Sequence, residues 1–93
     1  MKIKFSILAK KDMQSVWEYI SKDNVQAAQQ VMDRVLNTVS HMETFPAIGV
    51  MGRVQHTREF KVANTPLMIV YKIRHDTLFI VRILHSAQKW PRP

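Results

Sequence analysis

The chain lacks cysteine and contains only two glycines, which excludes several common kinds of site at the outset. Without cysteine it forms no disulfide and offers no thiolate to a metal ion. Two glycines are too few for a glycine-rich loop that cradles phosphate groups. The apolar runs also fall far short of the roughly 20 residues that span a membrane. The sequence therefore predicts neither a disulfide scaffold, nor a phosphate-binding loop, nor a transmembrane segment.

Acidic residues are scarce as well: seven stand against fourteen lysines and arginines, which gives a formal net charge of +7. In a chain of 93 residues this charge favours contact with nucleic acid, a nucleoprotein machine or an acidic protein. The apolar fraction of 46% is enough for one compact core. The apolar run in residues 1–8 is too short for a signal peptide, so we expect one cytoplasmic domain over residues 1–93.

Two segments carry apolar residues at helical spacing. In residues 9–20 and again in residues 28–42, apolar side chains recur every three to four positions and form one face. Asp23 or Asn24 is suited to cap the second helix, and Pro46 stops it. Because only a short polar break separates the two segments, they are expected to pack as an antiparallel hairpin.

The remaining apolar segments have the length and composition of β-strands, rich in Val, Ile, Phe, Tyr and Thr. They are residues 3–8, 53–62, 67–74 and 77–85. The two residues His75 and Asp76 match the length of a tight hairpin, although they lack its preferred glycine. The predicted fold class is α+β, with an N-terminal strand and an antiparallel two-helix hairpin packed on a mainly antiparallel sheet with three C-terminal strands.

Basic residues interrupt the apolar faces of two predicted strands. Strict alternation places His56 and Arg58 in one such face and Arg82 in another. A lone charge in a packed core is costly. Either Arg58 pairs with Glu59 or Asp76, and Arg82 reaches solvent at an edge, or both arginines belong to an open sheet face that docks a partner.

The histidines show no metal-ligand spacing, so the reaction worth weighing is RNA cleavage. It needs a base for the 2′-hydroxyl, an acid for the leaving oxygen and cations for the developing charge. His85 or His56 is the candidate for the base or the acid, and Arg58, Lys61 and Arg82 are able to hold a phosphate. A purely structural role explains the same residues, with the histidine hydrogen-bonded at a strand end and the cations solvated at the surface. The nuclease and the structural interpretation therefore both stay open.

Short motifs follow one another along nearly the whole chain, over roughly residues 5–91. They are Trp17-Glu18-Tyr19-Ile20, Phe45-Pro46 with Gly49, Thr57-Arg58-Glu59, Pro66 with Ile69-Val70-Tyr71, and Ile83-Leu84-His85-Ser86-Ala87-Gln88-Lys89-Trp90-Pro91. No single motif is specific, but their joint order resembles the RelE/ParE family of toxins from type II toxin–antitoxin systems.

The resemblance implies one of two activities, since RelE-like members cleave mRNA on the ribosome and ParE-like members poison DNA gyrase. The Thr-Arg-Glu strand and the ending from His85 to Pro91 look ParE-like. Met68 stands where RelE-like nucleases usually carry an arginine, and Trp90 is the only aromatic residue after the last strand, where they usually carry a tyrosine. The resemblance favours gyrase poisoning; for the alternative nuclease the candidate residues are Lys61, Arg58, Arg82 and His85.

Three positions depart from the ParE-like pattern. Val50 stands where an arginine is common, His56 where glycine is usual, and Leu67 where an aromatic residue is usual. These departures leave a third hypothesis, in which an attenuated toxin acts only as an antitoxin-binding co-repressor module.

Either branch implies a cognate antitoxin whose C-terminal segment brings apolar and acidic residues to the basic toxin. The other implied partner is DNA gyrase or the ribosome with its mRNA, with operator DNA reached only through the antitoxin. No membrane, metal or cofactor is implied. We expect Arg58 and Arg82 to become less accessible in the antitoxin complex. The residues expected to bind target or antitoxin are Arg53, His56, Arg58, Met68, Arg82, His85, Lys89 and Trp90.

Overall fold

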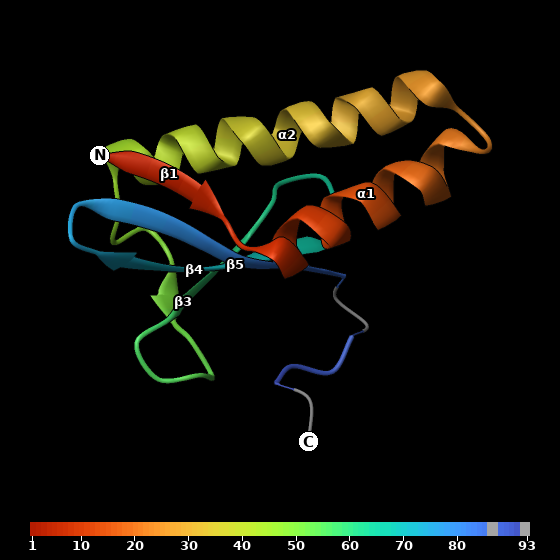
Figure 1. Cartoon of the computed structure of the whole chain (residues 1–93). Helices are drawn as coiled ribbons and strands as arrows, with labels where there is room; N and C mark the ends of the chain where they lie inside the picture. The colour runs from red at the N-terminus through yellow and green to blue at the C-terminus, as the bar shows by residue number, and fades with distance from the viewer. Residues whose placement is uncertain (86–87, 92–93) are drawn as a thin grey trace.

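A computed structural model describes residues 1–85 and 88–91, which form a pair of helices lying over one sheet (Figure 1). The elements in chain order are β1 (Lys2–Phe5), α1 (Ile7–Ser21), α2 (Val25–Thr44), β2 (Val50–Met51), β3 (Arg58–Lys61), β4 (Leu67–Arg74) and β5 (Thr77–His85). Within the described part of the chain, no helix is long and apolar enough to cross a bilayer. The predicted α+β fold is confirmed.

The strands form one mixed sheet in the order β1-β5-β4-β3-β2. β1 lies parallel to β5, and the other neighbours are antiparallel. The predicted two-residue hairpin joins β4 to β5, and its residues His75 and Asp76 have φ angles of 51° and 56°. A type I′ turn requires positive φ at both central positions, so these residues adopt the conformation that glycine usually supplies.

Each helix begins at a capping side chain. Ser6 Oγ accepts a hydrogen bond from the Ala9 N–H at 2.9 Å, and Asn24 Oδ1 accepts one from the Ala27 N–H at 2.9 Å. The Ser6 hydroxyl also donates to the Val81 carbonyl at 2.7 Å, which ties the start of α1 to β5. The Asn24 cap agrees with the sequence prediction, whereas the Ser6 cap starts α1 two residues before the predicted helix.

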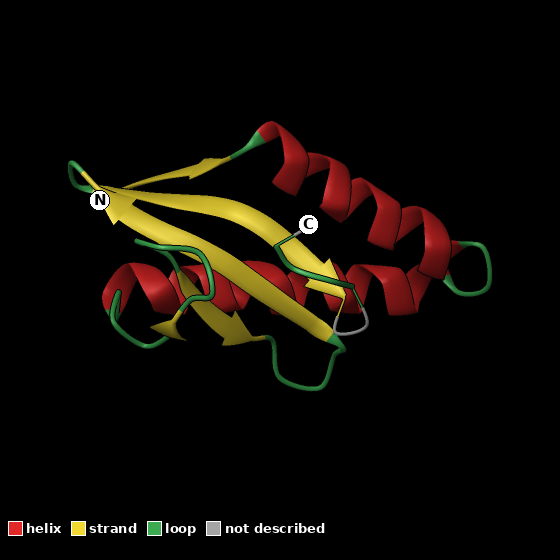
Figure 2. Cartoon of the chain, turned by 90° about the horizontal axis from the view of Figure 1, so that it is seen from below, coloured by secondary structure: helices red, strands yellow, loops and turns green. Residues whose placement is uncertain are grey.

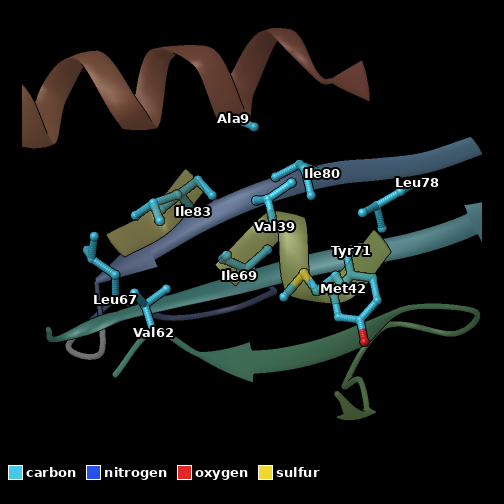
Figure 3. Packing of buried hydrophobic residues seen from close by; sticks show 11 residues of the cluster. Ala9, Val39, Met42, Val62, Leu67, Ile69, Tyr71, Leu78, Ile80 and Ile83 are labelled. Atoms are coloured by element: carbon cyan, nitrogen blue, oxygen red, sulfur yellow. The ribbon is translucent and has the colours of Figure 1, made fainter. Parts of the chain in front are cut away.

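The core lies between the helices and one face of the sheet (Figure 3). Its buried side chains include Val39 and Met42 of α2, Ile69 and Tyr71 of β4, and Ile80 of β5. Burial of each large apolar side chain stabilises the fold by about 1.5–3 kcal/mol. Because side chains alternate along a strand, this packing also fixes which residues face away from the helices.

A β-bulge reverses the alternation halfway along β5. Tyr71 of β4 pairs with Ile80, but its neighbour Val70 pairs with Arg82, which leaves Val81 as an extra residue. Ile80 therefore faces the helices, while Arg82 lies on the other side with Val70. Strict alternation predicts one face for both, and that prediction is wrong because of the bulge.

The predicted strand 53–62 is shorter in the structure because a turn replaces its first half. The Gly52 N–H donates to the Thr57 carbonyl at 2.8 Å, and His56 adopts a φ of 68°, which a strand does not accommodate. A Cβ atom on Gly52 would collide with Thr57 Oγ1, so this turn needs glycine. β3 begins only at Arg58, and the short strand β2, which the sequence does not predict, pairs with it.

Candidate functional site

The sheet face away from the helices is the surface that a docked partner would use under one of the two alternatives, and part of it is buried in the structure. Residues 88–91 lie on this side of the sheet, below it in Figure 1 and in front of it in Figure 2. Val70 and Leu84 belong to this face, yet their exposed fractions are only 0% and 1%. The centre of this face is therefore buried, which contradicts the alternative of a fully open docking face.

Arg82 is held in an internal ion pair. Its Nε and Nη2 donate to the two carboxylate oxygens of Asp12 at 2.8 and 2.9 Å, and the Ile83 N–H donates to the same carboxylate at 2.9 Å. Both charged side chains are 13% exposed. The hydrogen bond with Asp12 raises the pKa of the Arg82 guanidinium, against the opposing effect of burial. Asp12 of α1 thus closes the edge of β5 beyond the end of β1.

Arg58 faces the helices and fastens the segment that leads into β2. It lies opposite Tyr71, and its Nη1 donates to the Gly49 carbonyl at 2.7 Å. The Tyr71 hydroxyl accepts from the Gly49 N–H and donates to the Pro46 carbonyl, each at 2.8 Å. A Cβ atom on Gly49 would lie only 2.7 Å from that hydroxyl oxygen. The alternative in which Arg58 pairs with an acidic side chain is wrong, because backbone carbonyls are its partners.

Glu59 pairs with Arg53 instead. Its Oε2 accepts from the backbone N–H of Arg53 at 2.9 Å and from the guanidinium Nε at 3.1 Å. Burial raises the pKa of the Glu59 carboxyl, but these hydrogen bonds and the charge of Arg53 lower it by more, so it lies below its ordinary value. The pair holds the turn at residues 52–57 against β3. Asp76, the other expected partner of Arg58, lies 3.8 Å from the N-terminal ammonium.

Trp90 packs against the ion pair from the C-terminal segment. The Arg82 guanidinium carbon lies 5.6 Å from the centroid of the indole ring, a cation–π distance. The indole Nε1 is buried and has no acceptor among the described residues. Trp90 also borders a hollow of about 330 Å³ together with His56, Lys72 and Arg74. Trp90 and Arg82 are therefore in contact, as two neighbouring members of the predicted binding set.

The other candidate residues are spread over the molecule. Lys61 of β3 lies opposite Met68 of β4, and both line a second hollow together with Arg53. His85 ends β5 on the strand's exposed tip, and its backbone N–H donates to Gln88 Oε1 at 2.7 Å. His56 and Lys89 are exposed, the first in the 52–57 turn and the second in the C-terminal segment.

The residues suggested for a nuclease do not converge on one point. Arg58 faces the helices while Lys61, three residues further along the same strand, faces away from them. The Arg82 guanidinium is occupied by Asp12, and His85 lies at the far end of β5. Residues 1–85 and 88–91 also bring no three histidine or acidic side chains together as a metal site would. The arrangement offers single cations but no assembled catalytic group.

Sequence reasoning missed an apolar groove between the helical hairpin and the start of β4. It has a volume of about 420 Å³ and is lined by Ser15, Val16, Tyr19, Ile20, Val31, Pro66, Leu67, His85 and Gln88. Val16 and Ile20 belong to the predicted apolar face of residues 9–20, and both are only half-buried. The available signal is Tyr19, a large aromatic residue just outside the apolar stripe, with an exposed fraction of 79%.

Comparison with known proteins identifies a family that covers nearly the whole chain. Residues 3–90 match the model of the family described as the ParE toxin of type II toxin-antitoxin system, parDE. A protein from Sinorhizobium fredii, named "Putative toxin Y4kP", is 33% identical over 91 residues, which are 98% of this chain and 94% of that protein.

A solved structure supports the fold independently of close sequence similarity. It is described as the chromosomal ParDE TA system from P. aeruginosa, and it superposes with a TM-score of 0.81. The match covers 91% of this chain and 95% of that chain at 16% identity. The family match, the relative and the shared fold agree: the chain belongs to the ParE toxin family of type II toxin–antitoxin systems, within the RelE/ParE superfamily.

Proposed function

We propose that this toxin acts in the cytoplasm by binding DNA gyrase and trapping it on DNA, and that a cognate antitoxin neutralises it. Membership of the ParE family supports this target over the ribosome. The observation that carries the choice is the occupation of both candidate arginines, Arg58 by backbone carbonyls and Arg82 by Asp12.

Cleavage of RNA would need cations and a proton-transfer group within reach of a single phosphate. Arg82 is unable to bind a phosphate without first leaving a carboxylate that it contacts with two hydrogen bonds. Lys61 and Arg58 lie on opposite faces of β3, so the pair does not clamp one group. A toxin that acts by binding its target needs no such assembly, and the geometry agrees with that mode of action.

The groove beside α1 is the surface that best suits the antitoxin. Its lining is mainly apolar, with Val16, Ile20 and Leu67 as its floor and the exposed ring of Tyr19 at its rim. An amphipathic segment would bury its apolar side chains there, in the way a helix binds a hydrophobic groove. Acidic residues beside those side chains would meet a chain whose net charge is +7.

The candidate residues Arg53, His56, Met68, Lys89 and Trp90 then remain for the target or for the flanking part of the antitoxin. Arg53 and His56 lie on the turn 52–57, and Lys89 and Trp90 lie on the C-terminal segment. All four are next to the sheet face that points away from the helices. We propose that the target contacts this side of the toxin. Arg58 and Arg82 would support this surface indirectly, Arg58 by binding the Gly49 carbonyl and Arg82 by pairing with Asp12.

The test is a gyrase supercoiling and DNA-cleavage assay with the isolated toxin, run with and without ATP and with added antitoxin. Linear, gyrase-linked DNA that disappears when antitoxin is added would support the proposal. A parallel reaction with ribosomes and mRNA provides the contrast, since mRNA cleavage with no effect on gyrase would overturn it. Inactivity in both reactions, with antitoxin binding intact, would favour the attenuated co-repressor module.

A further inference from the structure

The net positive charge of this toxin lies outside the part of the chain that forms the helices. Residues 7–44, which contain both helices, carry four basic and five acidic side chains, so the helical layer is close to neutral. The remaining sequence carries ten basic and only two acidic side chains, Glu59 and Asp76. Residues 7–44 therefore carry a net charge of −1, and the sheet strands, their loops and the C-terminal segment together carry +8.

Four of these cations form a regular array on the face of the sheet away from the helices. Lys2 of β1 and Arg74 of β4 both lie opposite Thr77 of β5. Lys4 of β1 and Lys72 of β4 both lie opposite Phe79 of β5 (the sheet in Figure 2). With strands about 4.8 Å apart and a rise of about 3.3 Å per residue, the four backbone positions mark a rectangle of roughly 10 by 7 Å.

This array of Lys2, Lys4, Lys72 and Arg74 is not neutralised within the fold. Among residues 1–85 and 88–91, none of the four forms an ion pair. The acidic side chains of this layer already have partners, since Glu59 binds Arg53 and Asp76 lies beside the N-terminal ammonium. The array also borders the hollow of about 330 Å³ that Lys72 and Arg74 line with His56 and Trp90.

We propose that this array binds the sugar–phosphate backbone of a nucleic-acid duplex. Cores of protein interfaces are depleted in charged residues, whereas here the four cations surround only Thr77 and the half-buried ring of Phe79. A membrane surface would require apolar side chains that are free to insert. The Phe79 ring is not free in this way, because Lys72 Nζ lies over it, 6.0 Å from the ring centroid. A flat field of cations fits a partner that presents regularly spaced negative charges.

Binding of this kind has a distinctive salt dependence. Each neutralised phosphate releases condensed counterions, so four contacts give a slope of log K against log[salt] of about −3 to −4. Affinity would fall roughly 100-fold between about 50 and 200 mM salt. Since the array reaches no base edge, the affinity would depend little on base sequence.

The experiment compares two toxin variants that lose the same charge from opposite layers. Lys4→Gln/Lys72→Gln/Arg74→Gln removes three cations from the array, and Lys10→Gln/Lys11→Gln/Lys22→Gln removes three exposed cations from the helical layer. Fluorescence anisotropy measures their affinity for short mixed-sequence DNA and RNA duplexes over a salt series. Circular dichroism checks that both variants fold. Polyglutamate and vesicles containing phosphatidylserine serve as other anionic partners.

The array variant is expected to bind the duplex at least tenfold more weakly than the parent toxin at low salt, with a slope about 2–3 smaller in magnitude. The helix variant is expected to keep the parental slope. Comparison of the DNA and RNA arms identifies which backbone is preferred. Equal losses in the two variants, equally strong binding to polyglutamate or vesicles, or no duplex binding would overturn the inference. Because no gyrase is present, the result is independent of the proposed target.

Discussion

At the scale of single residues, Asp12 is the side chain whose loss should matter most. It accepts two hydrogen bonds from Arg82 and one from the Ile83 backbone, and it is largely buried. Asp12→Ala would leave a mostly buried guanidinium and a strand-edge N–H without partners, so we expect the free energy of unfolding to fall by about 2–4 kcal/mol. Urea denaturation measures this. The control is Asp33→Ala, which removes an exposed carboxylate that accepts a hydrogen bond from Gln29, and it should cost about 0.5 kcal/mol or less. An equal loss in both variants would contradict the prediction.

Glu59 should make the stability of the toxin depend on pH. Its pKa in the folded state lies below the ordinary value of about 4.3, so the unfolded state binds more protons in this range. The stabilisation is therefore fully present above the ordinary value and is lost as the pH falls through the folded pKa. We expect Glu59→Gln to be less stable than the parent at pH 7 and the difference to shrink below about pH 4. Urea unfolding from pH 3 to pH 7 tests this, with the exposed Glu43→Gln as control; a difference that stays constant with pH would refute it.

At the scale of elements, the Tyr71 phenol is one of the groups that hold the segment between α2 and β3. The Tyr71 hydroxyl accepts from the Gly49 N–H and donates to the Pro46 carbonyl, and Tyr71 itself is fully buried. Tyr71→Phe would leave the buried Gly49 N–H without an acceptor, which we expect to cost about 1–3 kcal/mol. Hydrogen exchange should become faster in β2 before it changes in β4. The control Tyr19→Phe removes the same atom from a side chain that is 79% exposed, and it should change neither the stability nor the exchange in β2. Unchanged exchange in β2 of Tyr71→Phe would contradict this role of the Tyr71 hydroxyl.

Elements with regular periodicity were predictable from sequence, whereas irregular backbone was not. β4 and β5 begin and end where the predicted strands 67–74 and 77–85 do, and Asn24 caps α2 as its short side chain suggests. The bulge at Val81 and the turn at His56 escaped prediction, because both depend on contacts with neighbouring strands and not on local pattern. His56 has a φ of 68°, a backbone conformation that glycine adopts more readily than other residues, so its identity gives no local signal of the turn.

The candidate site was less predictable than the fold. Sequence pattern correctly singled out Arg58 and Arg82 as charges in apolar strands, but their partners lie 9 and 70 residues away along the chain. Pairing over such distances is set by the three-dimensional packing of helix on sheet, which periodicity does not encode. The family resemblance supplied what pattern alone did not, namely the class of toxin and the existence of an antitoxin.

At the scale of the whole molecule, the apolar groove and the cationic array lie at opposite ends of the sheet. The groove includes Leu67 at the start of β4, and the array includes Arg74 at its end, about 20 Å away at a rise of about 3.3 Å per residue. One surface is apolar and lies against the nearly neutral helical layer, and the other is charged and faces away from it. Substitutions in the groove should therefore impair antitoxin binding alone, and substitutions in the array should impair duplex binding alone.

We expect Tyr19→Ala to weaken binding of the cognate antitoxin by about tenfold or more, as truncation of an aromatic anchor usually does, and to leave duplex affinity unchanged. Lys4→Gln/Lys72→Gln/Arg74→Gln should weaken duplex binding and largely keep the affinity for the antitoxin. Loss of three charges slows association with the antitoxin more than it weakens the apolar contacts in the groove. Isothermal titration with the antitoxin and anisotropy with the duplex measure both properties on the same preparations. If either variant lost both properties to the same degree while remaining folded, the antitoxin would have to span the groove and the array together, and the two-surface description of this toxin would be wrong.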